Sequence, residues 1–261
     1  MKLDDAYANG RYIDGAEDYP PRWSALAQDF RDNLGERARL DIRYGDRDRE
    51  RFDLFLPDSP IRGLCVFIHG GYWMAFDKSS WSHLARGPLE RGWAVAMPSY
   101  DLCSDVTIPE ITAQMTKAMP EMAAQVDGPI VLAGHSAGGH LVSRLLDKSL
   151  LSEDLGSRIE RVVPISPLSN LRPLLQTTMN ETLQLTEETA ASESPVDMMD
   201  RYPANVTVWV GSAERPAFLD QASWLSQAWG ADCVRDAGKH HFNVIDALMD
   251  PSSELVDALV G

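Results

Sequence analysis

The sequence predicts an α/β protein in which a mostly parallel sheet of eight strands is covered by helices on both faces. Strand-like and helix-like segments alternate from about residue 64 onward, which favours parallel strands joined by helical crossovers. Two of the strand-like segments, Leu64–Ile68 and Pro129–Ala133, are continuous apolar runs, as expected of strands buried on both faces. The chain has 261 residues, of which 44% are hydrophobic, and this size and composition suit a single domain spanning residues 1–261.

The elements follow one another in a regular order. A polar N-terminal arm, residues 1–35, contains a helix over 23–31, and Pro20-Pro21 separates the arm from this helix. Two strands near 39–44 and 51–56 alternate apolar with charged residues, which is typical of an antiparallel edge. Further strands are expected near 64–68, 93–98, 129–133, 161–165, 206–210 and 231–235. Helices are expected near 79–91, 108–126, 137–148, 216–229 and 244–260.

The most informative motif is Gly134-His135-Ser136-Ala137-Gly138, which lies between an apolar strand and a helix-like run. A G-x-S-x-G turn in that setting predicts a nucleophile elbow, because the tight turn exposes the serine hydroxyl and tolerates only small residues two positions away. The N-terminus of the following helix favours negative charge developing beside the serine. We therefore expect Ser136 to be a nucleophile. An ordinary glycine-rich turn is the alternative, and the context upstream and downstream decides between them.

A second glycine motif follows the strand at 64–68. The segment His69-Gly70-Gly71-Tyr72-Trp73 stands where hydrolases with an elbow place an H-G-G loop. Such a loop supplies backbone N–H groups to the oxyanion, and glycine lets the backbone approach the substrate closely. We expect the N–H groups of Gly70 and Gly71, joined by that of Ala137, to form the oxyanion hole.

A serine nucleophile needs a base, and the base needs an acid to orient it. Downstream of the elbow and its helix, the only histidines are His240 and His241, on a loop after the last strand, and we expect His241 to be the base. Glu214 follows the strand at 206–210 and is the expected acid, although a solvated pair with Arg215 is the alternative. Two other carboxylates fit less well by position: Asp220 and Asp236.

With these motifs in place, the chain resembles the α/β-hydrolase superfamily, and within it the arylformamidase (kynurenine formamidase) branch and related H-G-G esterases. The family segment that matches residues 211–218 usually carries aspartate where this chain has Glu214. The resemblance covers roughly residues 5 to 250. The segments that carry it are Tyr7–Arg31, His69–Trp73, Ser99–Cys103, Val106–Ile111, Gly134–His140, Gly211–Phe218 and His241-Phe242.

The resemblance implies a serine hydrolase that cleaves an aryl formamide such as N-formylkynurenine, giving kynurenine and formate in tryptophan catabolism. Three aromatic residues near the H-G-G loop, Tyr72, Trp73 and Phe76, are candidates for binding the leaving group, with core packing as the alternative. A carboxylesterase of short-acyl esters is a second hypothesis, and a hydrolase-fold binding protein without catalysis is a third.

An acidic segment between the sixth and seventh strands indicates a further element. Residues 168–200 include six carboxylates and no Lys or Arg after Arg172. Hydrolases of this fold carry a cap at this place, and we expect a small helical cap over residues 167–200 that covers Ser136.

Composition restricts the remaining possibilities. The net charge of −15 opposes binding to nucleic acid or to anionic membranes, so a small-molecule substrate is expected. The polar first thirty residues argue against a secretory signal, no apolar run is long enough to span a membrane, and three scattered cysteines suit a cytoplasmic protein. No metal-binding pattern is present, and no cofactor is expected. The sequence leaves open whether the protein is a homodimer.

Overall fold

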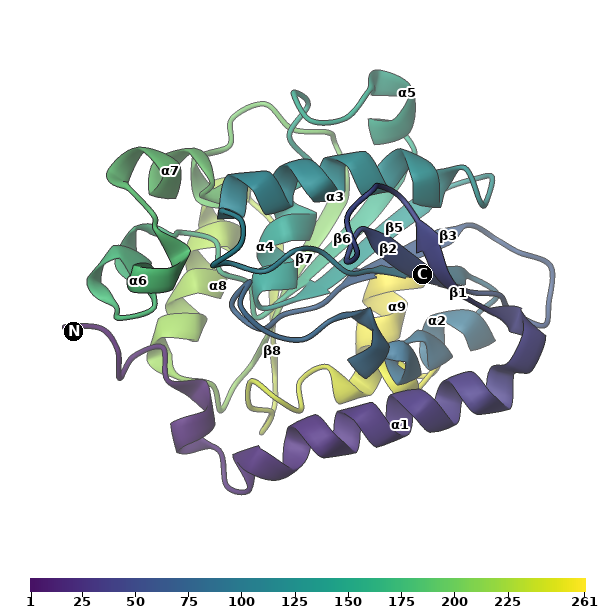
Figure 1. The fold of residues 1–261 in the computed structure, drawn as a ribbon, viewed down its shortest axis with the longest axis horizontal. Coiled ribbons are helices and arrows are strands. Elements are labelled where there is room, and N and C mark those ends of the chain that lie inside the picture. Colours follow the sequence, from purple (N-terminus) through teal and green to yellow (C-terminus); the bar gives the residue numbers. More distant parts are fainter.

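The computed structural model describes all residues from 1 to 261. Its centre is one eight-stranded sheet with the strand order β1-β2-β4-β3-β5-β6-β7-β8 (Figure 1). β2 runs antiparallel to both of its neighbours, β1 and β4. All the remaining neighbouring strands pair in parallel. The strands are β1 (Ala38–Arg43), β2 (Arg51–Phe55), β3 (Leu64–Ile68), β4 (Ala94–Pro98), β5 (Ile130–His135), β6 (Ile159–Ile165), β7 (Asn205–Gly211) and β8 (Asp232–Asp236). All eight predicted strands are therefore confirmed, and so is the α/β class.

Two hydrophobic cores lie on the two faces of the sheet. Along β3, Leu64, Val66 and Ile68 belong to one core, whereas Cys65 and Phe67 belong to the other, because successive strand residues point to opposite faces. Helices α3 (Ile108–Ala123), α4 (Ala137–Arg144) and α8 (Pro216–Trp229) contribute to the first core. Helices α1 (Tyr19–Leu34), α2 (Arg86–Glu90) and α9 (Glu254–Val260) pack on the second, and Figure 1 shows α1, α2 and α9 together beneath the sheet.

Two predicted helical segments are each divided into shorter elements. The segment expected over 79–91 is divided into two 3-10 turns, Lys78–Ser80 and Ser82–Ala85, followed by α2. The segment expected over 244–260 is divided into a 3-10 turn, Asp246–Met249, and α9. Pro251 lies between them; it has no N–H to continue a helix, and the Ser253 side chain then caps α9 by accepting the N–H of Val256.

The N-terminal helix begins earlier than predicted. Instead of separating the arm from the helix, Pro20 and Pro21 lie in the first turn of α1, which starts at Tyr19. Proline is tolerated there because the first N–H groups of a helix have no partner within it. Before α1, the arm forms two 3-10 turns, Asn9–Tyr12 and Ala16–Asp18. The arm therefore leads directly into the helix that covers one face of the sheet.

The segment between β6 and β7 is helical, as expected. It contains two short α-helices, α6 (Asn180–Leu183) and α7 (Glu187–Ser192), flanked by 3-10 turns at Arg172–Gln176 and Pro195–Asp197. Buried leucines at 171, 174 and 183 fix it to the first core. A separate short helix, α5 (Glu153–Gly156), precedes β6. No helix in the structure combines the length and the apolar character needed to cross a membrane.

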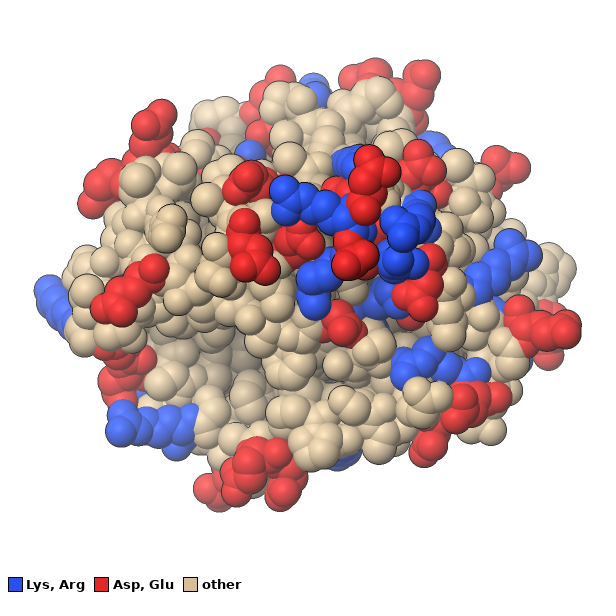
Figure 2. All heavy atoms as spheres, in the orientation of Figure 1, with Lys and Arg blue, Asp and Glu red and all other residues tan.

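Charged side chains of both signs share the surface. Figure 2 shows Lys and Arg mixed with Asp and Glu, most densely over the loop between β1 and β2, while uncharged atoms border the hollow below it. Some ionic groups reach the interior; for example, the Lys78 ammonium lies 2.7 Å from the buried Asp53 carboxylate and 2.9 Å from that of Asp41. Lys78 holds the pKa of Asp41 below its usual value by hydrogen bonding to the carboxylate.

Buried histidines predict how stability depends on pH. Burial lowers the pKa of His69 and His83 to about 4, that of His140 to about 3, and that of His135 well below its ordinary value. These rings stay neutral in the folded state, whereas the unfolded chain binds protons below about pH 6.5. The free energy of unfolding should therefore fall as the pH decreases from 7.5 to 5, by about 2 kcal/mol for each such histidine.

The replacement His83→Phe tests this expectation, because both ring nitrogens of His83 are buried without a hydrogen-bond partner. The free energy of unfolding is measured by urea titration at pH 7.5 and at pH 5. Between these two pH values it should fall by about 2 kcal/mol less in the variant than in the unmodified protein. An unchanged pH dependence would mean that His83 is not neutral in the folded state.

Candidate active site

Ser136 stands at the turn between β5 and α4. Its backbone has φ 56° and ψ −115°, a conformation that a non-glycine residue rarely adopts and that is typical of the sharp strand-to-helix turn predicted from the sequence. The turn is held by hydrogen bonds on both sides: the Ser136 N–H donates to the Ile165 carbonyl at 2.8 Å, and the His140 N–H donates to the Ser136 carbonyl at 3.1 Å. The backbone strain is therefore imposed by the sheet and by the helix that follows.

The glycines of the motif are required by close backbone contacts. A Cβ at Gly134 would lie 2.2 Å from the Gly138 carbonyl oxygen, and a Cβ at Gly138 would lie 1.9 Å from that of Ile68. These distances are well below van der Waals contact, so no larger residue fits either position without moving the strand or the helix.

His241 and Glu214 form a buried pair, as the sequence predicted. The Nδ1 atom of His241 lies 2.7 Å from Oε2 of Glu214, and both side chains are buried. Oε1 of Glu214 accepts a short hydrogen bond from the Ser166 hydroxyl and a second, at 2.9 Å, from the Gly211 N–H. Three donors thus fix the carboxylate, which in turn fixes the Nδ1–H tautomer of His241 and leaves Nε2 as the basic nitrogen.

The alternative partner of Glu214 is occupied elsewhere. Arg215 pairs with Asp5 at 2.9 Å, and its guanidinium lies over the Tyr12 ring, 3.6 Å from the centroid. The two weaker acid candidates are also placed otherwise, since Asp220 is exposed on α8 and Asp236 accepts the indole N–H of Trp209 at 3.3 Å. The geometry therefore selects Glu214 as the partner of His241.

The second histidine of the loop, His240, is not in this pair; its Nε2 lies 3.1 Å from the Tyr19 hydroxyl. Another histidine that the sequence analysis did not select lies beside the site. His135 donates its Nε2–H to the backbone carbonyl of His241 at 2.9 Å, and the two rings are 4.6 Å apart. Burial lowers the pKa of His135 well below its ordinary value, so it is a neutral support for the loop that carries His241.

The loop after β3 approaches Ser136 as predicted. A Cβ at Gly70 would lie 3.0 Å from Cβ of Ser136, and Gly71 adopts φ 106°, which favours glycine. The backbone N–H groups of Gly70, Gly71 and Ala137 donate no hydrogen bond within the chain. His69 stabilises the loop by stacking on Tyr100, and the Tyr100 hydroxyl donates to the His69 carbonyl at 2.9 Å. These N–H groups remain available for an oxyanion.

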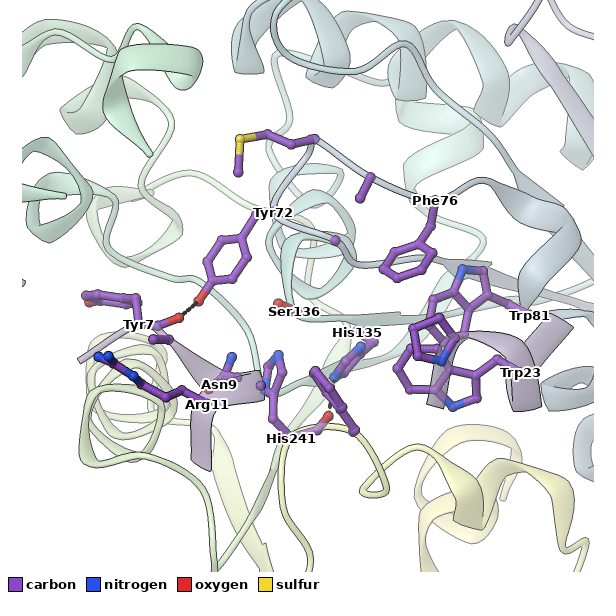
Figure 3. A pocket seen from close by; sticks show the side chains of 17 residues that line it. Tyr7, Asn9, Arg11, Trp23, Tyr72, Phe76, Trp81, His135, Ser136 and His241 are labelled. Atoms are coloured by element: carbon purple, nitrogen blue, oxygen red, sulfur yellow. Dashed lines mark hydrogen bonds between the residues drawn. The ribbon is translucent and has the colours of Figure 1, made fainter. Parts of the chain in front are cut away.

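Ser136 and His241 lie together in a cavity of about 490 Å³. Neither Oγ of Ser136 nor Nε2 of His241 has a hydrogen-bond partner within the chain. Figure 3 shows Ser136 near the middle of this cavity, with His241 and His135 below it. A serine hydroxyl, a histidine oriented by a carboxylate and unused backbone N–H groups are the parts needed for acyl transfer.

Two of the three expected aromatic residues line the cavity. Tyr72 and Phe76 do so, but Trp73 does not, and the prediction of Trp73 as a substrate contact is wrong. Trp73 is the last of three successive residues with positive φ, after Gly71 and Tyr72. Its side chain is fully buried, and its ring meets the His140 ring edge-on. A residue's order along such a loop does not show which side chains face the substrate.

The sequence analysis missed the aromatic group that shapes the cavity. Trp23 from α1, Trp81 and Phe242 line it together with Phe76. The rings of Trp23 and Trp81 lie 4.7 Å apart, and the ring of Phe76 meets each of them edge-on at 5.5 to 6.0 Å. These residues come from three distant parts of the sequence, around positions 23, 76–81 and 242, so only the fold brings them together.

The N-terminal arm covers the cavity, and the expected cap does not. No residue of 167–200 lines the cavity. The arm, in contrast, contributes four lining residues that were not predicted: Tyr7, Asn9, Arg11 and Pro20. The prediction of a lid over Ser136 from the acidic segment is therefore wrong. Its apolar residues turn into the core beside α8 and α4, which keeps its short helices away from the serine. No cluster of three or more His, Cys, Asp or Glu side chains is placed to hold a metal ion.

Comparison with known proteins finds relatives in sequence and in structure. The kynurenine formamidase of Danio rerio is 27% identical over 245 residues, which cover 86% of this chain and 84% of that protein. A crystal structure from Silicibacter sp. tm1040, described there as a candidate thioesterase, is 64% identical, has a TM-score of 0.99 and covers both chains completely. Esterase B of Lactobacillus rhamnosis is 17% identical with a TM-score of 0.70, covering 97% of this chain and 92% of that one, and shows a shared fold.

The resemblance inferred from the motifs is thus confirmed by sequence and by structure. A model of the alpha/beta hydrolase family matches residues 65–258, a range that begins within β3 and ends within α9. It includes Ser136, Glu214 and His241. The chain therefore belongs to the alpha/beta hydrolase family.

Proposed function

We propose that this protein is a serine hydrolase that cleaves aryl formamides such as N-formylkynurenine, releasing formate and the aryl amine. The observation that carries the proposal is the juxtaposition in one aromatic cavity of Ser136 with the His241–Glu214 pair. The kynurenine formamidases that match most of the chain at 26–27% identity support the choice of a formamide.

The chemistry follows from the placement of the groups. His241 Nε2 takes the proton of Ser136 as Oγ attacks the formyl carbon, and the negative oxygen is stabilised by the N–H groups of Gly70, Gly71 and Ala137. Each such donor typically contributes about 3 kcal/mol to the stability of the transition state. The imidazolium then gives its proton to the leaving amine, and water repeats the sequence to release formate.

The cavity favours an aryl leaving group. The walls formed by Trp23, Phe76 and Trp81 offer ring faces and edges to a planar substrate. A formyl group is the smallest acyl group, so it needs no acyl pocket beyond the space between the serine and the oxyanion loop. An aryl amine is also a better leaving group than an alkyl amine, so general-acid protonation by His241 is enough to expel it.

A carboxylesterase is the second candidate, because the same residues can cleave short-acyl esters. The relative described as a candidate thioesterase, at 64% identity, supports an acyl ester or thioester as the substrate. The experiment is steady-state hydrolysis of N-formylkynurenine, p-nitrophenyl acetate, p-nitrophenyl butyrate and S-phenyl thioacetate, with Ser136→Ala as the blank.

We expect kcat/KM for N-formylkynurenine to exceed that for each ester and for the thioester by tenfold or more. Turnover of an ester or the thioester with negligible cleavage of the formamide would reject the formamidase and leave the esterase. Turnover of none of the four would count against both.

A further inference from the structure

The N-terminal arm places an unpaired polar side chain in the cavity. Asn9 is 5% exposed and lines the cavity, yet neither Nδ2 nor Oδ1 of its amide has a hydrogen-bond partner. Buried amides in native proteins are almost always paired, because an unsatisfied donor or acceptor is costly. An unpaired amide in a candidate active site therefore points to a partner that the substrate supplies.

The arm is held firmly, so this unpaired amide is a fixed feature of the cavity wall. The Tyr72 hydroxyl donates to the Tyr7 carbonyl at 2.7 Å, which joins the arm to the oxyanion loop. Gln221 of α8 donates its amide N–H to the Tyr7 hydroxyl at 3.0 Å. Further along the arm, the Thr178 N–H donates to Asp4 at 2.6 Å. These anchors hold Asn9 in place before any ligand binds, which lowers the entropic cost of binding.

The charge of the cavity wall is opposite to that of the protein. The chain carries 39 acidic and 24 basic residues, but no carboxylate lines the cavity, and Arg11 is the one Lys or Arg that does. The guanidinium of Arg11 lies 3.6 Å from Asp5 in an exposed pair, with the Arg11 side chain 72% exposed. Exposed pairs of this kind are weak, so Arg11 can bind a carboxylate of a ligand instead.

The polar and aromatic parts of the cavity lie at opposite ends. Figure 3 shows Asn9 and Arg11 on one side of Ser136, and Trp23, Phe76 and Trp81 on the other. A substrate that fills the cavity therefore presents an aryl group to one end and a polar group to the other. The amide of Asn9 needs both an acceptor and a donor, and Arg11 needs an anion.

We infer that Asn9 and Arg11 form a subsite for a zwitterionic α-amino acid group carried by the aryl substrate. Its carboxylate accepts from the Arg11 guanidinium and the Asn9 N–H, and its ammonium donates to the Asn9 carbonyl oxygen. This inference rests on the proposed function, and it assigns the arm the role of distinguishing amino-acid formamides from simple aryl formamides.

The test compares N-formylkynurenine with formanilide, which has an aryl formamide bond but no amino acid group. Asn9→Leu and Arg11→Gln should each lower kcat/KM for N-formylkynurenine at least tenfold and change kcat/KM for formanilide less than threefold. Arg39→Gln, an exposed arginine on β1, is the matched control and should alter neither. Because Asn9→Leu removes an unpaired buried amide, its Tm should equal or exceed that of the unmodified protein.

Equal losses on both substrates, or no loss on either, would overturn the inference. If the unmodified protein cleaves neither formamide, the proposed function has failed, and the subsite is judged by binding alone. Kynurenine is then titrated into Ser136→Ala, with tryptophan fluorescence as the readout. Aniline, which lacks the amino acid group, is titrated as the comparison ligand. Binding of kynurenine that Asn9→Leu weakens at least tenfold would support the subsite, and binding that it leaves unchanged would reject it.

Discussion

Replacing Ser136 by alanine is expected to lower kcat at least ten-thousand-fold, to the level that binding and the oxyanion hole alone provide. The Oγ atom of Ser136 has no partner within the chain and lies in the same cavity as the His241 ring. No other serine lines that cavity, so none can substitute. The measurement is single-turnover and steady-state hydrolysis of the best substrate found for the unmodified protein.

Ser223→Ala is the matched control, since Ser223 lies on α8 outside the cavity and hydrogen-bonds only to Gln227. It should retain full activity. Circular dichroism should show that Ser136→Ala remains folded, because the turn is held by main-chain hydrogen bonds that alanine preserves. A folded Ser136→Ala protein that keeps more than a tenth of the activity would contradict the assignment.

Replacing Glu214 by glutamine is expected to lower kcat about a thousand- to ten-thousand-fold while leaving KM little changed. The carboxylate accepts hydrogen bonds from His241, Ser166 and the Gly211 N–H. A glutamine amide has one acceptor oxygen and one NH₂ group, so it cannot accept from all three donors. Placing the NH₂ group opposite His241 would reverse the tautomer and remove the basic Nε2.

Two further variants separate the role of the charge from that of the geometry. Glu214→Asp keeps the charge but is one methylene shorter, so it should retain more activity than Glu214→Gln and lose more than tenfold against the unmodified protein. Ser166→Ala removes one hydrogen-bond donor to the Glu214 carboxylate and should lower kcat less than either Glu214→Gln or Glu214→Asp does. An activity of Glu214→Gln within tenfold of the unmodified protein would show that Glu214 does not orient the base.

The sequence predicted those parts of the site that depend on local order along the chain. The elbow, the H-G-G loop, Glu214 and His241 each follow a predicted strand, and parallel strands bring their carboxyl ends to one edge of the sheet. The glycines of these loops were predicted for a steric reason, and the close approach at Gly134 confirms that reason. Continuous apolar runs such as Leu64–Ile68 also located the central strands accurately.

The remaining parts depend on tertiary packing that no local pattern shows. The positive φ of Trp73 turns its side chain into the core, and a single sequence gives no indication of this. Ser166 follows β6 and supports Glu214, but a serine at a strand end carries no pattern that predicts such a role. The polar arm showed no motif of its own, although Tyr7–Arg31 carried part of the family resemblance; its role as the cavity wall arises because α1 packs beneath the sheet.

The helix errors have simpler causes. Pro20 and Pro21 lie in the first turn of α1, where proline favours the start of a helix instead of breaking it. Pro251 does break a helix, because it separates the 3-10 turn Asp246–Met249 from α9. The place of the acidic segment between β6 and β7 predicts a lid, but its leucines at 171, 174 and 183 are buried and fix it to the core instead.

The central claim is that Ser136 is a nucleophile activated by His241. Its most direct test is reaction with a fluorophosphonate, followed by peptide mass spectrometry of the labelled protein. The account predicts one adduct per chain, on the peptide that contains Ser136, with labelling slowed at least a hundredfold in His241→Ala. An adduct on a different residue, or no adduct with a folded protein that still turns over substrate, would contradict it.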